Sequence, residues 1–311
     1  MLDWLHPHKH PGWVAVAPQG ADAWAVHLVQ APGSRPQLRW ACRIDWRQPT
    51  QALRQLRRQH QLARHQSVLL LQRHQYQLLP LEAPEVPREN WRDALRWQIK
   101  DMVDFPVETA AIDLLEIPAE ASARGRTTLL VAAAPHAELA PLAHAGEDAA
   151  APWHAIDLPE TALRNLAALL EEPGRAQALL QLGDNHSQLV ITAQGELLQS
   201  RHIDVTLAQL NEPDAAHRQQ AWDHAGLELQ RTLDSFERLF SRVNLARLLV
   251  APASASAFSD SFIDYLRELV YVPVQPLPLA ELVDFSLVPE LAEPDAQGPY
   301  LYAIGAALRG A

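Results

Sequence analysis

Few residues of the 311-residue chain combine the types and the spacing that metal binding or catalysis requires. His6, His8 and His10 alternate near the first residue, and imidazoles so spaced can share a divalent metal. A proline between the first two and the expected mobility of a terminus favour an adventitious site. Cys42, the single cysteine, precedes an arginine that could lower its pKa, yet a buried strand thiol is the commoner arrangement. The sequence therefore predicts no catalytic residue and no metal site.

Composition restricts the classes of protein open to the chain. Hydrophobic residues make up 48% and charged residues 20%, the balance of a folded globular protein. A net charge of −11 argues against nucleic-acid binding. The arginines at 54, 57, 58 and 64 are best read as the solvated side of an amphipathic helix. Apolar stretches fall far short of the roughly 18 to 20 residues of a membrane span, and neither a signal peptide nor a cysteine pair is evident. We therefore expect a cytoplasmic protein.

The elements of the first half begin with three short strands, at residues 13–17, 23–30 and 38–44, joined by Pro/Gly turns. The arginine-bearing helix and strands at 67–72 and 76–81 follow. A helix over residues 88–103 is predicted from the spacing of Trp91, Leu95, Ile99 and Met102.

The rest of the first half is predicted as a strand pair, a short helix, a connection and a second helix. The strands lie at residues 110–117 and 127–134, the short helix follows Pro135, and the connection covers residues 144–152. Asp157 and Glu160 have the spacing of a capping box that starts the next helix.

The second half repeats this order. Strands are predicted at residues 178–182, 188–192 and 196–203, and a long helix at 217–243 carries Leu229, Leu233, Phe236, Phe240 and Val243 on one face. A strand at 245–250, a helix at 258–269, a strand at 272–275 and a helix at 302–309 complete the chain. Two such units in series predict an α/β fold with duplicated, ribonuclease-H-like lobes of the actin-like ATPase type, by analogy of pattern.

A more specific resemblance lies in one segment of the first half. There Ala94-Leu95-Arg96-Trp97 opens the helix and Phe105-Pro106 closes it. In this and three further segments, in the same order, the chain resembles the MshI/PilM family of type IV pilus assembly proteins. The further segments are Asp157-Leu158-Pro159-Glu160, Leu227-Glu228-Leu229-Gln230-Arg231-Thr232-Leu233-Asp234 and Ala303-Ile304-Gly305-Ala306-Ala307-Leu308-Arg309. The resemblance implies a first lobe at 1–174 with an FtsA-type inserted subdomain at about 74–146, and a second lobe at 175–311 with an outer subdomain at about 205–245.

The same resemblance implies a non-catalytic scaffold in a type IV pilus assembly machine of the MSHA type. It would dock the cytoplasmic tail of a PilN/MshJ-like inner-membrane protein, and the assembly ATPase is a possible second partner. Arg96, Trp97, Asp104 and Phe105 are the partner-binding residues it implies. The protein would be cytoplasmic and peripheral to the inner membrane through its partner.

A working actin-like ATPase needs an acidic residue and glycine in each of two phosphate loops. The first loop here reads Ala17-Pro18-Gln19, and the second has Gln181 in the place of the acid. The adenosine loop, Ala251-Pro252-Ala253, lacks the expected glycines. We therefore expect no cofactor and no enzyme activity, with weak binding or hydrolysis of ATP and magnesium as the alternative. The vestigial nucleotide cleft would comprise Gly183, Asp184, Asn185, Ser187 and Gly305.

Overall fold

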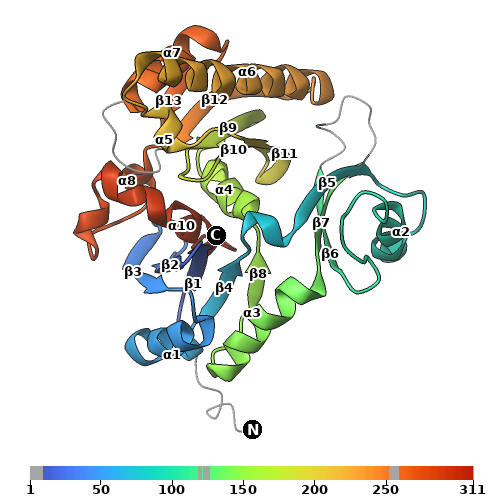
Figure 1. Cartoon of the computed structure of the whole chain (residues 1–311), viewed down its shortest axis with the longest axis vertical. Helices are drawn as coiled ribbons and strands as arrows, with labels where there is room; N and C mark the ends of the chain where they lie inside the picture. Colours follow the sequence, from blue (N-terminus) through green and yellow to red (C-terminus); the bar gives the residue numbers. More distant parts are fainter. Residues whose placement is uncertain (1–9, 118–120, 122–126, 252–258, 311) are drawn as a thin grey trace.

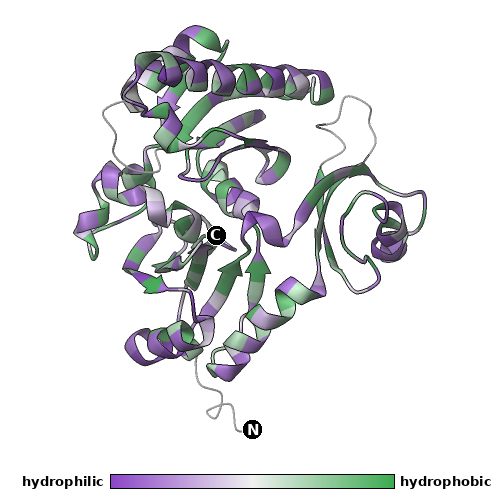
Figure 2. Cartoon of the chain, viewed as in Figure 1, coloured by the Kyte–Doolittle hydropathy of each residue, from purple (hydrophilic) through white to green (hydrophobic). Residues whose placement is uncertain are grey.

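The computed structural model describes residues 10–117, 121, 127–251 and 259–310. Its strands form three sheets, and helices cover their faces (Figure 1). Hydrophobic residues follow the central strands, and α1 (Pro49–His60) is largely hydrophilic (Figure 2). Among the described helices, none is long and apolar enough to span a bilayer.

The first sheet has the strand order β3-β2-β1-β4-β8. Strands β1, β2 and β3 form the predicted antiparallel meander, whereas β4 and β8 lie parallel to β1. The predicted arginine-bearing helix is confirmed for Arg54, Arg57 and Arg58, which face solvent while Leu53 and Leu56 are fully buried. Arg64 is also exposed, but it lies beyond the end of this helix, in a separate turn. The elements are β1 (Trp13–Gln19), β2 (Asp22–Val29), β3 (Gln37–Asp45), α1 (Pro49–His60), η2 (Leu62–Arg64), β4 (Gln66–Leu70) and β8 (Ala155–Asp157).

The second sheet repeats this topology in the order β11-β10-β9-β12-β13. Its first three strands are an antiparallel meander, and β12 and β13 are parallel to β9. The duplication that the sequence predicts is therefore confirmed. The elements are β9 (Arg175–Gln181), β10 (Ser187–Ala193), β11 (Glu196–Ile203), α5 (Leu207–Leu210), α6 (Ala215–Leu239), β12 (Asn244–Ala251), α7 (Ser259–Leu269) and β13 (Val274–Pro276).

The third sheet is a separate antiparallel unit of order β5-β7-β6. Its strands are β5 (Gln77–Glu82), β6 (Ala111–Ile117) and β7 (Thr128–Ala134). Helix α2 (Trp91–Gln98), which follows the turn η4 (Arg88–Asn90), covers one face of this sheet. Leu95 of α2 and Ile99, which follows the helix, pack with Leu129 and Val131 of β7. The sheet lies within the segment predicted as an insertion, and the boundaries of the lobes stay predictions.

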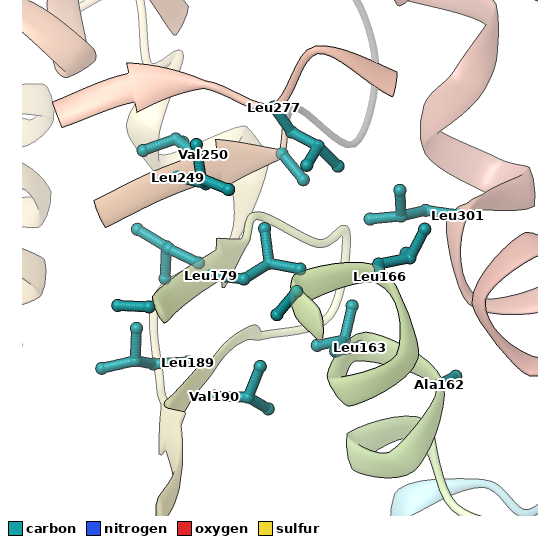
Figure 3. Packing of buried hydrophobic residues seen from close by; sticks show 14 of the residues in the cluster. Ala162, Leu163, Leu166, Leu179, Leu189, Val190, Leu249, Val250, Leu277 and Leu301 are labelled. Atoms are coloured by element: carbon teal, nitrogen blue, oxygen red, sulfur yellow. The ribbon is translucent and has the colours of Figure 1, made fainter. Parts of the chain in front are cut away.

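Helix α4 (Pro159–Ala168) ties the two large sheets together. Figure 3 shows Leu163 on the side of α4 that faces the second sheet, near Val190, and Leu166 directed toward Leu301. The remaining elements are η3 (Arg73–Gln75), α3 (His136–Asp148), α8 (Leu279–Leu282), η5 (Pro289–Leu291), α9 (Pro294–Gln297), η6 (Gly298–Tyr300) and α10 (Leu301–Ala307).

Four local predictions are wrong. The long helix predicted at 217–243 stops earlier, because α6 ends at Leu239 and leaves Phe240 and Val243 beyond it. Helix α2 ends at Gln98, so Met102 leaves the apolar face and is 47% exposed. The connection predicted at residues 144–152 starts later, because α3 continues to Asp148. Asp157 does not cap α4 in a box with Glu160: the N-cap is Leu158, and Asp157 accepts from the Leu158 N–H and the Thr161 hydroxyl.

Candidate functional site

A cleft of about 870 Å³ lies where the two large sheets meet. Its walls are the β1–β2 turn, the η3 segment, the β9–β10 turn and the start of the C-terminal helices. Both predicted phosphate turns enter it: Ala17, Pro18 and Gln19 from the first, and Gly183, Asp184 and Asn185 from the second. The two halves of the duplicated fold thus face each other across the cleft.

Gly183 is required by the shape of its turn. A Cβ atom there would lie 2.3 Å from the carbonyl oxygen of His186, which is far inside van der Waals contact. Ser187 follows this turn but does not line the cleft, because it is buried and its hydroxyl donates to the Val205 carbonyl at 2.8 Å. Three of the five predicted cleft residues are therefore gathered there.

Gly305, the fifth, has a packing role outside the cleft. A Cβ atom at this position would lie 2.2 Å from the carbonyl oxygen of Ala162, so α10 and α4 touch through their backbones. The Asn165 side-chain amide donates to the Gly305 carbonyl at 2.9 Å, which fixes the same contact. The glycine is thus explained by helix packing.

We expect Gly305→Ala to lower the free energy of unfolding by about 1–3 kcal/mol, because the added methyl must separate two packed helices. Urea unfolding followed by circular dichroism measures the change. A variant as stable as the wild-type chain would contradict this account of the α4–α10 contact.

Neutral residues occupy the two places in the cleft where an actin-like ATPase needs an acidic side chain. Gln181 is 4% exposed; its amide nitrogen donates to the Leu182 carbonyl at 2.8 Å, and its oxygen accepts from the Tyr302 hydroxyl at 2.8 Å. Ala17 occupies the equivalent place on β1. A metal-bound nucleotide needs carboxylates at these places, so the residues present do not fit it. The adenosine loop predicted at 251–253 falls largely on residues outside the described part of the chain.

The basic residues of the cleft gather near Arg73. The rings of His186 and His202 lie 4.3 Å apart, and both line the cleft with Arg73. Burial lowers the pKa of His186 to about 4, and charge repulsion from His202 and Arg73 contributes to this shift. Burial also lowers the pKa of His202. Both imidazoles are therefore neutral at pH 7, and the guanidinium is the cation of this group.

A buried carboxylate contacts Tyr76, which lines the cleft, and its spacing in the sequence had predicted another role. Glu160 is 3% exposed, and the Tyr76 hydroxyl donates to its Oε2 at 2.5 Å. Burial raises the pKa of Glu160, and burial together with this carboxylate raises that of Tyr76. The pair joins the segment before β5 to α4. Only the spacing of Glu160 was visible in the sequence, and it indicated a helix cap.

A second hollow, which we call the groove, has a volume of about 690 Å³ and lies between the third sheet, β11 and the end of α6. It joins the cleft, since Arg73, Gln188 and His202 line both. Its charged lining comprises Arg73, Glu82, Glu160, Arg201 and Arg238, and its apolar lining comprises Leu78, Pro80, Leu81, Ile117, Leu130, Leu198, Leu239 and Phe240.

The four predicted partner-binding residues do not line the groove. They belong to α2 and the turns after it, which cover the opposite face of the third sheet: Leu129 and Val131 face α2, whereas Leu130 faces the groove. Their part in partner binding stays a prediction.

Individually, the four side chains differ. Arg96 donates to the carbonyls of Val107 and Ala110, and Phe105 packs against the core of the third sheet. Asp104 accepts from the Gln77 amide at 2.9 Å. Trp97 is 64% exposed, with the Lys100 ammonium 5.5 Å from its ring.

No family model matches the chain, and no curated protein matches it. Among solved structures, it is similar to a chain of a "PilM-PilN type IV pilus biogenesis complex", with 20% identity over 98% of this chain and 99% of the other, and a TM-score of 0.69. It is similar to the cytoplasmic domain of EpsL, an inner-membrane component of the Vibrio cholerae type II secretion system (13% identity, 85% and 89% covered, TM-score 0.52).

A third similar structure is a Bacteroides thetaiotaomicron protein described as having an actin-like ATPase fold and unknown function (8% identity, 92% and 96% covered, TM-score 0.52). All three likenesses extend over most of both chains. Together with the duplicated sheets, they show that the chain has the actin-like ATPase fold.

Proposed function

We propose that the chain is a non-catalytic scaffold of a type IV pilus assembly machine, of the MSHA type, that docks the cytoplasmic tail of a PilN/MshJ-like inner-membrane protein. The observation that carries the proposal is the groove, a hollow with both apolar and charged lining, in a fold that resembles a chain of the PilM–PilN complex over 98% of this chain. The protein would be cytoplasmic and held at the inner membrane by its partner. The assembly ATPase is a second partner under the same proposal.

The groove has the chemistry that an extended peptide needs. Its apolar lining can contact aliphatic side chains of a peptide. A small number of buried contacts of this kind supplies most of the affinity of an interface. Leu239 supports this use, because its apolar side chain is 46% exposed to solvent at the wall of the groove. A bound peptide would remove this apolar surface from water. The cleft, in contrast, lacks the metal-facing carboxylates.

The proposal predicts no magnesium-dependent ATP hydrolysis above the buffer background, because Ala17 and Gln181 supply no carboxylate to a metal. Phosphate release from millimolar ATP measures it. The alternative, a weak ATPase, would be supported by turnover that disappears in Asp184→Ala, since Asp184 is the exposed acid of the second turn.

The decisive test of docking is a matched pair of leucine variants on α6. Leu239 lines the groove and is 46% exposed, whereas Leu227 lies elsewhere on the helix and is 44% exposed. Titration with the tail peptide of the PilN-like protein should show that Leu239→Glu weakens binding by about tenfold or more, because a carboxylate replaces an apolar side chain that the bound peptide would cover. Leu227→Glu should keep the affinity within about twofold.

Loss of binding in both variants, or in neither, would contradict the assignment of the groove. Loss in neither, combined with loss in Trp97→Ala, would move the site to the far face of the third sheet, where the sequence placed it. Melting temperatures of all variants establish that each remains folded.

A further inference from the structure

Strand β11 leaves one edge unpaired beside the groove. It is the last strand of the second sheet and pairs only with β10 in the described part of the chain. An edge strand presents a row of free backbone N–H and C=O groups, which is a template for another strand. This edge is therefore able to bind a further extended segment.

The groove follows that edge rather than one face of the strand. All five residues 198–202 line it, although side chains of successive residues in a strand point to opposite faces. Its walls are likewise on both sides: Ser235 and Leu239 come from the end of α6, and Leu78 and Leu130 from the third sheet. A hollow with this lining is open along the backbone of β11.

In the described part of the chain, two side chains on β11 each carry one polar atom without a hydrogen-bond partner. The Gln199 Oε1 and the His202 Nδ1 are buried and accept or donate no hydrogen bond among the described residues. Buried polar atoms are nearly always hydrogen-bonded in folded proteins. Both residues line the groove, so a rotation of either side chain would bring its unpaired atom to a segment that enters the groove.

Of the two outer strands of the third sheet, β5 lines more of the groove, and its edge is a poorer template than that of β11. Strand β5 is also an outer strand, and Pro80, Leu81 and Glu82 line the groove. Pro80 has no N–H group, so it interrupts the row of donors that an incoming strand would need. The comparison selects β11.

Charge indicates the nature of the segment. Arg201 already pairs with Glu228 at 2.6 Å, and Glu160 accepts from Tyr76. Arg238, beside Leu239, forms no ion pair among the described residues, in a chain of net charge −11. An acidic side chain in the segment would complement this guanidinium.

We infer that the tail of the membrane partner docks by adding a strand to the free edge of β11, with apolar side chains at alternate positions and a carboxylate opposite Arg238. This inference rests on the proposed function and specifies its geometry. Backbone hydrogen bonds would then supply part of the affinity, and the alternate side chains the specificity.

The test is a set of tail peptides that carry a single N-methyl group at successive backbone nitrogens. An added strand directs every second N–H toward its neighbour, so methylation at alternate positions should weaken binding by about tenfold and at the intervening positions by less than about threefold. Amide exchange measured by NMR should show protection at alternate residues of β11 in the complex.

A second arm exchanges each peptide carboxylate for an amide. The exchange should weaken binding to the wild-type chain by more than about threefold at one position and leave binding to Arg238→Gln unchanged. Equal losses in both proteins would overturn the assigned pairing.

The outcomes separate the two proposals. If the unmodified peptide binds and N-methylation shows no alternation, strand addition is overturned and the docking function stands. If the unmodified peptide does not bind the wild-type chain, the docking function fails and strand addition fails with it. Protection of β5 amides in place of β11 amides would show that the peptide adds to the edge of β5, and it would overturn the inference.

Discussion

Phe236→Ala is expected to lower the free energy of unfolding by about 3–5 kcal/mol, since the truncation removes a large apolar side chain and leaves a cavity. Phe236 is fully buried on α6, and its ring stacks on that of Phe240 at 5.2 Å. Helix α6 is held to the second sheet by this side of its surface, with Leu229 and Leu233 also fully buried. Urea unfolding followed by circular dichroism measures the effect.

Leu239→Ala is the matched control, because Leu239 lies on the same helix and is 46% exposed. It should change stability by less than about 0.5–1 kcal/mol, as surface substitutions usually do. Phe240→Ala should also destabilise the fold by about 3–5 kcal/mol, because Phe240 is 5% exposed. If Phe236→Ala cost less than about 1 kcal/mol, the apolar face assigned to α6 would be wrong.

The strands and the long helix could be predicted because their signals are local. Strand β11 has the predicted bounds, Glu196–Ile203, and Leu229, Leu233 and Phe236 all lie on the buried face of α6. Apolar residues at every second position indicate the buried face of a strand, and apolar residues spaced 3 and 4 apart indicate the buried face of a helix. The fold class followed from the repeated order of these elements.

The end of α2 could not be read in the same way. The helical spacing continues from Trp91 through Met102, but the helix stops at Gln98. Leu95 and Ile99 reach the core of the third sheet, and after them the chain turns and exposes Met102. Where a short helix stops depends on the sheet it packs against, and that sheet comes from residues later in the chain.

The cleft was predictable and the groove was not. Equivalent turns of two duplicated lobes had to face each other, so Gln19 and Gly183 were placed correctly from element order. The groove combines β5, β11 and α6, which are distant in sequence and share no motif. Gly305 shows a related limit. A single sequence does not distinguish a glycine that lets a ligand approach the backbone from one that lets two helices pack closely, as Gly305 does.

Tyr76→Phe is the second change with a large expected effect, because it leaves a buried carboxylate without its donor. The Tyr76 hydroxyl is 2.5 Å from Glu160, and the two residues are 2% and 3% exposed. Removing one partner of a buried, charged hydrogen bond costs about 1–3 kcal/mol or more. Urea unfolding of the variant at several pH values measures the loss.

The pH dependence follows from the raised pKa of Glu160, whose ordinary value is 4.5. The folded chain holds this proton more tightly than the unfolded chain, so stability falls as pH rises from about 4.5 through the folded pKa. Tyr76→Phe removes the hydrogen bond that favours the ionised form, and its cost should therefore be greater at pH 8 than at pH 5. Glu160→Gln should remove this part of the pH dependence.

An exposed pair provides the control for this prediction. Tyr271 is 55% exposed, and partial burial together with the neighbouring Glu237 raises its pKa, so Tyr271→Phe should cost less than about 0.5 kcal/mol. The double variant Tyr76→Phe/Glu160→Gln should lose less than the sum of the single changes, since the two side chains touch. Additive losses, or a cost for Tyr76→Phe no greater than that for Tyr271→Phe, would show that the Glu160 carboxylate does not depend on the Tyr76 hydroxyl.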